Sequence, residues 1–353
     1  EILIGLVGSE MCIRDRTKEV CCEVMGFELR EDEDTAERIR SYFKSKGGNM
    51  PKNNLKQAML PVGGTVFENN HGTAPGAALE KNGKCVIILP GPPGELAPMF
   101  NESVRGFLKK YSDGAIVSHT VNIIGMGESS VAEEIEDMFD AKNPTVAPYA
   151  KSGEVRLRIT AKAKTADEAD KMCAPVVDEI CSRLGDVVYG TDMNSIEERV
   201  VALLKEKGKK IATAESCTAG YIPKRLTDIP GASEVFECGI VSYSNDMKTK
   251  LLGVSPKTLE TYGAVSEQTA REMALGAKRV SGADIAISTT GLAGPGGDGV
   301  LPGGLSFAAV TDGERTVVEK IVTGHENDRE YNRYVTASRA LNLVRLMLEE
   351  KIK

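Results

Sequence analysis

A serine that follows a short apolar run is the residue whose placement most strongly suggests chemistry. Ser216 lies in the segment Thr213-Ala214-Glu215-Ser216-Cys217-Thr218-Ala219-Gly220, which is predicted to open a helix-like stretch. At such a strand-to-helix turn, a hydroxyl lies beside free backbone N–H groups and the positive end of a helix dipole. This place suits an activated nucleophile, an oxyanion or a phosphate. The same serine also fits an ordinary helix N-cap, and the segment alone does not decide between these roles.

A serine needs a base to become a nucleophile, and lysine is the base that this region offers. Lys248 follows the loop Val241-Ser242-Tyr243-Ser244-Asn245, and His325 is the one histidine in this part of the sequence. A lysine acts as a base when burial or a neighbouring cation lowers its pKa. Ser216, Tyr243 and Lys248 therefore form a candidate Ser–Lys–Tyr group. The alternative is that Lys248 is a solvated surface lysine and Tyr243 a core ring, since most lysines are exposed.

Two further segments carry groups that bind anions. The loop Thr290-Gly291-Leu292-Ala293-Gly294-Pro295-Gly296-Gly297 lets the backbone approach a ligand closely and present N–H groups to a phosphate. Arg329 and Arg333 are four residues apart near the start of the last predicted helix, so they share one helix face and can hold a phosphate bidentately. Glycine-rich loops are common, however, and an arginine pair also fits a solvated helix face.

Alternating strands and helices are predicted to position these four loops. The third region begins near Met193, where Ser195 and Glu198 form a capping box for a helix that Gly208 ends. The further elements are predicted strands at 210–214, 239–242, 285–289, 305–310 and 316–322 and predicted helices at 266–280 and 328–350. This order indicates a layered α/β domain, with ligand loops where strands end and helices begin.

The two preceding regions have different patterns. Up to residue 112 we predict a helix at 34–46 and a buried strand at 85–89, with Gly/Pro-rich loops at 70–76 and 89–95. From 113 to 190 we predict strands at 116–124, 155–163 and 187–189 and helices at 128–139 and 166–184. That βαβαβ order suits a small α+β domain, so we expect three domains, at 1–112, 113–190 and 191–353.

Composition excludes several classes of protein. The 353 residues have a formal net charge of −7, which argues against a general nucleic-acid binder, since that function needs a basic face. No apolar run is long enough to cross a membrane. Eight cysteines without a CxxC pair, together with three histidines, make a zinc site or a disulfide framework a poor fit. Reduced thiols in a chain of this size point to the cytoplasm.

Taken together, the loops of the third region resemble the C-terminal domain of the competence/damage-inducible CinA family. The matching segments are Ala214-Glu215-Ser216-Cys217-Thr218, Gly239-Ile240-Val241-Ser242-Tyr243-Ser244-Asn245, Gly263-Ala264-Val265-Ser266 and Thr290-Gly291-Leu292-Ala293-Gly294-Pro295, and the arginine pair also fits. The resemblance covers nearly all of 196–348. It implies a nicotinamide mononucleotide deamidase, which converts the carboxamide of its substrate to a carboxylate and releases ammonia in pyridine-nucleotide recycling.

The resemblance also implies roles for individual residues. It makes Ser216 the nucleophile, with Tyr243 and Lys248 as its partners and helix-start N–H groups as the oxyanion site. Deamidation would need no cofactor. Ala219 stands where the family often has glycine, and the loop after Pro295 departs from the family pattern. The positions expected to contact the nucleotide substrate are Thr218, Asn245, Thr290, Gly291, Ala293, Gly294, Arg329 and Arg333.

The first two regions also resemble CinA. Gly72-Thr73-Ala74-Pro75-Gly76 and Leu89-Pro90-Gly91-Pro92-Pro93-Gly94-Glu95 look like the family's molybdopterin-binding-like α/β domain, which is linked to metal-dependent ADP-ribose pyrophosphatase activity. The middle region looks like the KH-type domain, although Gly125-Met126-Gly127 lacks the basic neighbours of an RNA clamp. Residues 1–16 do not fit the family's first βαβ unit and glycine-rich loop. We therefore expect a partial first domain behind a foreign leader, with weak pyrophosphatase activity.

Three functions are weighed on these grounds. An amidohydrolase acting on nicotinamide mononucleotide is favoured by the Ser216, Tyr243 and Lys248 set. A pyrophosphatase that uses a divalent metal in the first domain is the alternative enzyme. A pterin- or nucleotide-binding interaction protein that supports DNA uptake is the non-enzymatic alternative, and the acidic charge weakens it. The resemblance further implies a homodimer, while composition argues against membrane and nucleic-acid partners.

Overall fold

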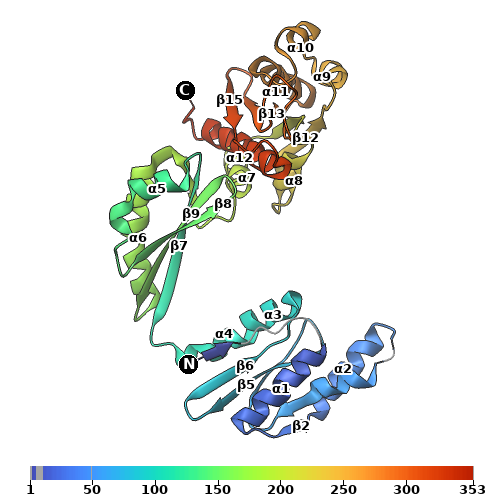
Figure 1. The fold of residues 1–353 in the computed structure, drawn as a ribbon, viewed down its shortest axis with the longest axis vertical. Helices are drawn as coiled ribbons and strands as arrows, with labels where there is room; N and C mark the ends of the chain where they lie inside the picture. The colour runs from blue at the N-terminus through green and yellow to red at the C-terminus, as the bar shows by residue number, and fades with distance from the viewer. Residues whose placement is uncertain (1, 5–10, 49, 353) are drawn as a thin grey trace. The chain divides into compact units, whose positions relative to one another are not determined.

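The computed structural model describes residues 2–4, 11–48 and 50–352, which divide into two units, Glu1–Asp113 and Gly114–Lys353 (Figure 1). The first unit has a four-stranded sheet in the order β1-β6-β5-β4 and a separate pair, β2-β3. Its main elements are β1 (Ile2–Ile4), α1 (Met11–Met25), β2 (Leu29–Glu31), α2 (Glu33–Ser45), β3 (Met59–Pro61), β4 (Thr65–Phe67), β5 (Gly76–Lys81), β6 (Lys84–Ile88), α3 (Pro93–Met99) and α4 (Arg105–Leu108).

Local sequence explains the elements of this unit. Asp32 caps α2 by accepting a hydrogen bond from the Thr35 N–H at 2.8 Å, and the helix lies within one residue of its predicted bounds. Asn82 and Gly83 both have positive φ, which is the two-residue turn that joins β5 to β6. The short β1 pairs in parallel with β6 at the edge of the sheet. The expectation about a foreign leader falls partly on residues 1 and 5–10, which lie outside the described residues.

The middle part of the chain forms an antiparallel sheet in the order β10-β7-β9-β8, with α6 packed on β7 and β9. Its elements are β7 (Ala115–Ile124), α5 (Glu128–Glu134), β8 (Thr145–Lys151), β9 (Glu154–Ala163), α6 (Ala166–Leu184) and β10 (Val188–Thr191). The predicted βαβαβ order missed β8, because Pro148 interrupts its strand pattern. A proline is tolerated there because β8 is an edge strand. The predicted helix at 128–139 is also too long, since α5 ends at Glu134 and a 3₁₀ turn follows.

The last part of the chain is a layered α/β fold, as predicted. Its five-stranded sheet has the order β12-β11-β13-β14-β15, in which β12, β11 and β13 are parallel and β14 and β15 are antiparallel. The elements are α7 (Ile196–Glu206), β11 (Ile211–Glu215), α8 (Tyr221–Thr227), β12 (Phe236–Val241), α9 (Asn245–Leu252), α10 (Pro256–Tyr262), α11 (Glu267–Ser281), β13 (Ile285–Gly291), β14 (Leu305–Thr311), β15 (Thr316–Val322) and α12 (Arg329–Leu348).

Strand alternation separates two packing layers in this sheet. On β13, Ile285 and Ile287 join the core under α12, while Ala286 packs with α11. The α11 side is lined with small residues, and a Cβ added at Gly276 would meet the Leu252 carbonyl oxygen at 2.0 Å. The helix α11 therefore lies very close to α9, the helix that carries Lys248.

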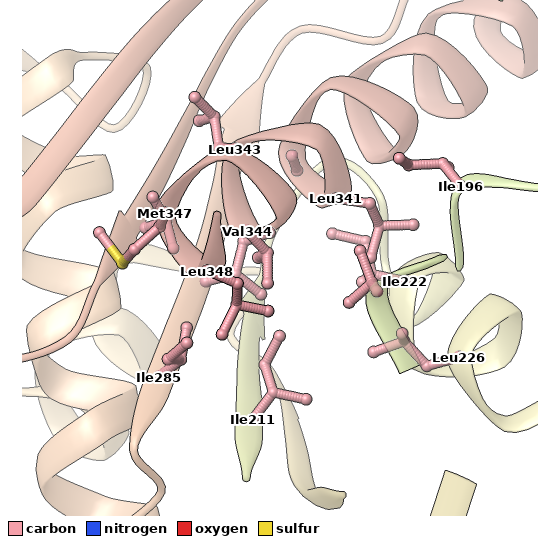
Figure 2. Close-up of a cluster of buried hydrophobic side chains, with 14 of the residues drawn as sticks. Ile196, Ile211, Ile222, Leu226, Ile285, Leu341, Leu343, Val344, Met347 and Leu348 are labelled. Carbon is pink, nitrogen blue, oxygen red and sulfur yellow. The ribbon is translucent and has the colours of Figure 1, made fainter. Parts of the chain in front are cut away.

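The larger core fixes the two elements that flank Ser216. Leu341, Val344 and Leu348 of α12 pack with Ile211 of β11 and Ile222 of α8 in one buried cluster (Figure 2). Because β11 ends just before Ser216 and α8 begins five residues after it, both ends of this turn are anchored in the same core. None of the helices in the described part of the chain is long and apolar enough to cross a membrane.

The start of α7 differs slightly from the predicted capping box. Ser195 caps the helix by accepting from the Glu198 N–H at 3.4 Å, as expected. The Glu198 carboxylate instead accepts from the Asn194 N–H at 2.8 Å, one residue before the N-cap. The reciprocal bond is therefore shifted by one position, and the helix start is still satisfied.

Candidate active site

Ser216 is the first residue after β11, in a turn formed by residues 216–220 that we call the nucleophile turn. Its N–H donates to the Thr289 carbonyl at 2.9 Å and so continues the hydrogen bonding between β11 and β13. The expectation that Ser216 opens the helix is wrong, because α8 begins at Tyr221 with Gly220 as its N-cap. Ala219 and Gly220 both have positive φ, which delays the helix. Glycine, which the family often has where this chain has Ala219, adopts this left-handed conformation readily.

Lys248 lies beside Ser216 in the interior of the protein. Its Nζ is 3.0 Å from Ser216 Oγ, 3.0 Å from the Ser242 carbonyl oxygen and 3.2 Å from the Tyr243 carbonyl oxygen. The side chain is 1% exposed, so Lys248 is not the solvated lysine of the alternative interpretation. Burial lowers its pKa from the usual value of 10.5, and each of these three partners is a neutral oxygen.

Tyr243 takes part in the site in two ways. Its carbonyl oxygen accepts from Lys248, whereas its phenol oxygen accepts from Arg329 at 3.3 Å. The ring is 61% exposed and is therefore not a core ring. The contact between Tyr243 and Lys248 is thus made by backbone, and the phenol belongs to the open side of the site.

A pocket of about 330 Å³ lies over the Ser216 and Lys248 pair. Ser216, Tyr243 and Lys248 line it together with six of the eight expected substrate positions, Asn245, Thr290, Gly291, Ala293, Gly294 and Arg329. Cys217, Ala264 and Val265 also line it, and no role was predicted for them. The segment that contains Ala264 and Val265 was visible as a family motif, but small apolar residues carry no sign of a ligand contact.

The glycine-rich loop is held by the start of α12. Arg329 donates to the Gly294 carbonyl at 2.8 Å, and the Gly296 N–H donates to the Glu326 carbonyl at 3.0 Å. Gly294 has a φ of 90°, and a Cβ there would meet the Glu326 carbonyl oxygen at 2.4 Å. Only glycine fits this approach, so the loop is fixed in place while its inner edge faces the pocket.

Thr218 and Arg333 are absent from the pocket lining and hold the nucleophile turn. Arg333 donates to the Thr218 carbonyl at 2.6 Å, and its guanidinium lies 5.6 Å from the centre of the Tyr221 ring. The hydroxyls of Thr218 and Thr289 are 2.6 Å apart and buried. The arginine pair expected to share one phosphate is therefore divided, with Arg329 at the pocket and Arg333 behind the turn.

Glu215 is the functional-site residue that sequence reasoning missed. Its carboxylate is fully buried and accepts from the Ile222 N–H at 3.2 Å. Burial raises its pKa, and hydrogen bonds from the Thr218 hydroxyl and the N–H groups of residues 220–222 oppose that rise. The helix-start N–H groups were expected to bind the oxyanion, but the Ile222 N–H donates to Glu215 and the Tyr221 N–H donates to the Thr218 carbonyl. The signal that the sequence offered for this role was an acidic residue directly before Ser216. The sequence does not show, however, that its side chain points into the interior of the protein.

Comparison with known sequences identifies the family. Models of three domains match consecutive parts of the chain: the CinA C-terminal domain at 193–348, the damage-inducible protein CinA KH domain at 118–190 and a probable molybdopterin binding domain at 11–110. A Clostridium beijerinckii protein, whose name describes it as competence-damage inducible, is 50% identical over 330 residues, or 93% of this chain and 80% of its own length. The chain belongs to the CinA family.

Other CinA relatives are similar over much of the chain. A CinA-like protein of Desulfovibrio desulfuricans is 45% identical over 334 residues, which are 94% of this chain and 78% of the relative. A crystal structure of the competence/damage inducible protein CihA from Agrobacterium tumefaciens is 38% identical over 44% of this chain and 93% of that one, with a TM-score of 0.42. The resemblance read from the motifs is confirmed, and so is the three-part fold class.

The first unit of this CinA protein contains a larger pocket, of about 660 Å³, remote in sequence from Ser216. Gly72, Thr73 and Pro75 of the first Gly/Pro motif line it, beside Asp32 and Asp34. Among the residues that the structure describes, no group of three or more His, Cys, Asp or Glu side chains gathers to hold a metal ion. We derive no step through a metal there.

Proposed function

We propose that this CinA protein is an amidohydrolase that converts nicotinamide mononucleotide to nicotinate mononucleotide and ammonia. The observation that carries the proposal is the 3.0 Å contact between Ser216 Oγ and the buried Lys248 Nζ. A hydroxyl beside a lysine of lowered pKa is a nucleophile with its own base. The pocket above this pair offers Arg329 for the phosphate and the Asn245 side chain for polar groups of the nucleotide.

Burial favours the neutral form of Lys248, and its hydrogen bonds are compatible with that form. A neutral amine has two N–H groups and one lone pair, whereas an ammonium has three N–H groups. The carbonyl oxygens of Ser242 and Tyr243 accept two protons from Nζ, which leaves the third direction toward Ser216 Oγ. In the neutral form the lone pair lies in that direction and accepts the Ser216 hydroxyl proton. Since the three partners include no carboxylate, this set supplies no ion pair to offset the burial of a positive charge.

The reaction follows from this arrangement. Lys248 takes the Ser216 proton as Oγ bonds to the carboxamide carbon, and the carbonyl π electrons move to its oxygen. Protonated Lys248 returns the proton to the amide nitrogen, the C–N bond breaks and ammonia leaves. Water then attacks the acyl-enzyme, Lys248 takes its proton, and the acid forms as Ser216 regains a hydrogen. Cys217 lines the pocket directly after Ser216, so its backbone N–H is our candidate donor to the oxyanion.

The pH dependence of deamidation is expected to report the lysine. Because Lys248 is the base, the rate should rise with pH through the Lys248 pKa and level off above it. Burial lowers that pKa, so this limb is expected below the usual lysine value of 10.5. The measurement is kcat/KM for nicotinamide mononucleotide across pH, with protein stability checked at each point. A rate that falls as pH rises through this range would contradict a lysine base.

Deamidation is expected to survive removal of residues 1–190. The proposed machinery lies between Glu215 and Arg333, and the core under α12 lies almost wholly in the remaining fragment. The fragment loses contacts from α12, because Arg345 donates to the carbonyls of Asp186 and Val188 and Ser338 contacts Glu154, so its unfolding temperature should fall.

The test is ammonia release from nicotinamide mononucleotide by the full chain and by fragment 191–353, each with and without a chelator. We expect both proteins to be active, with rates that the chelator leaves unchanged. A folded, soluble fragment without activity would place essential residues in the first 190 positions. Loss of activity on chelation would show that the reaction needs a metal.

A further inference from the structure

Glu215 is a buried carboxylate that the proposed reaction does not use directly. It is the last residue of β11, and its carbonyl accepts from the Ser242 N–H at 2.9 Å, so its backbone is fixed between two loops of the site. The side chain is 0% exposed and does not line the pocket. No ion pair that the structure gives for the described residues includes it. A carboxylate in this position is costly to bury unless hydrogen bonds compensate it.

Most of the groups that offset the burial of this carboxylate lie at the end of the nucleophile turn and just after it. Oε2 accepts from the Ile222 N–H at 3.2 Å and Oε1 accepts from the Thr213 hydroxyl at 3.5 Å, while the Thr218 hydroxyl and the N–H groups of Gly220 and Tyr221 further stabilise the charged form. The side chain just before the turn thus binds the first residues of α8 just after it, so the bond spans the whole turn. The turn contains two residues with positive φ, a conformation that needs such support.

Arg333 also binds this turn. It donates to the Thr218 carbonyl at 2.6 Å, while the Thr218 hydroxyl lies 2.6 Å from that of Thr289. The turn is therefore held by a carboxyl group that bonds to the start of α8 just after it and by a cation that binds one of its carbonyls. Both groups lie outside the pocket lining, so neither is placed to contact substrate.

We propose that Glu215 is a positioning residue that holds the nucleophile turn, and so sets the Ser216 hydroxyl against the Lys248 amine. This inference rests on the proposed deamidase function. The critical distance is the 3.0 Å between Oγ and Nζ, and Ser216 is the residue joined directly to Glu215. A displacement of about 1 Å at a reacting group can reduce a rate by roughly a hundredfold.

The first test is Glu215→Gln. The amide keeps the shape of the side chain, but it accepts hydrogen bonds at one atom and brings two N–H groups toward the N–H groups of α8. We expect kcat for nicotinamide mononucleotide to fall by about tenfold to a hundredfold, with KM nearly unchanged because Glu215 is outside the pocket. Glu215→Asp keeps the charge but shortens the side chain. It should also lower kcat, and it carries the test if the glutamine variant does not fold.

Glu272→Gln is the matched control. The Glu272 carboxylate accepts from the Ser255 N–H at 2.7 Å and the Thr258 hydroxyl at 2.6 Å, so it makes the same kinds of bonds at a loop that does not line the pocket. Its kcat should match that of the unchanged chain. An equal loss of kcat in this control would show that Glu215 has only the general structural role of a loop-binding carboxylate.

Amide hydrogen exchange gives a readout that is independent of activity. Both Glu215 variants should exchange faster at residues 217–222 than the unchanged chain, with β13 and α12 unaltered. Unchanged exchange there, or a kcat per folded molecule equal to that of the unchanged chain, would overturn the proposal. If the unchanged chain releases no ammonia, the deamidase proposal fails by itself, and exchange still decides whether Glu215 holds the turn.

Discussion

Replacing Ser216 by alanine is expected to reduce ammonia release from nicotinamide mononucleotide by on the order of 10⁴-fold or more. The change removes the one atom that bonds to the carboxamide carbon, and it removes the hydroxyl whose proton Lys248 accepts as the base. Ser216 is 9% exposed at the foot of the pocket, and its N–H still bonds to Thr289, so the turn should keep its conformation. The measurement is kcat by ammonia detection, with circular dichroism and thermal unfolding on the same samples.

Ser288→Ala is the matched control for this substitution. Its hydroxyl is also buried in the sheet, where it donates to the Ala270 carbonyl at 2.5 Å, but it does not line the pocket. We expect a moderate loss of stability, about 1 kcal/mol, and a kcat close to that of the unchanged chain. If Ser216→Ala retained more than about a tenth of the rate, Ser216 would not be the nucleophile.

Sequence patterns predicted the arrangement of the loops well, because the order of the strands determines where the loops lie. The parallel strands β11, β12 and β13 end at the same edge of the sheet, and Ser216, Tyr243 and Gly291 follow or end them. Residues 32 positions apart, Ser216 and Lys248, meet for this reason. The loops could therefore be placed at one edge from the order of strands, while the resemblance to CinA was needed to assign Ser216, Tyr243 and Lys248 to one site.

The direction of individual side chains could not be predicted in the same way. Arg329 and Arg333 share a helix face by spacing, yet one faces the pocket and the other binds the Thr218 carbonyl, because the nucleophile turn packs against only the second. Burial of Lys248 depends on the close packing of α9 on α11, which involves residues far apart in sequence. Glu215 was missed because an acidic residue is normally exposed, whereas this one is buried with backbone N–H and threonine hydroxyl partners and no ion pair among the described residues.

Lys248→Arg is expected to be nearly as damaging as Lys248→Ala, with kcat reduced by on the order of 10³-fold or more in both. Arginine keeps a positive charge but is not deprotonated in proteins, so it cannot accept the Ser216 proton. Its larger planar group must also fit where a single nitrogen now bonds to Ser242, Tyr243 and Ser216. A Lys248→Met variant, which is similar in length and uncharged, separates the loss of the base from the loss of packing.

Lys250→Arg is the matched control, because Lys250 is an exposed lysine of the same helix and does not line the pocket. Its activity should equal that of the unchanged chain. The decisive comparison is between the charged arginine and the neutral methionine at position 248. If the base is lost in both, they should be similarly inactive, and the limb of the pH profile assigned to Lys248 should disappear in each. Substantial activity in the arginine variant alone would instead make Lys248 an electrostatic group that stabilises negative charge, and the Ser216 proton would then have to leave by another route.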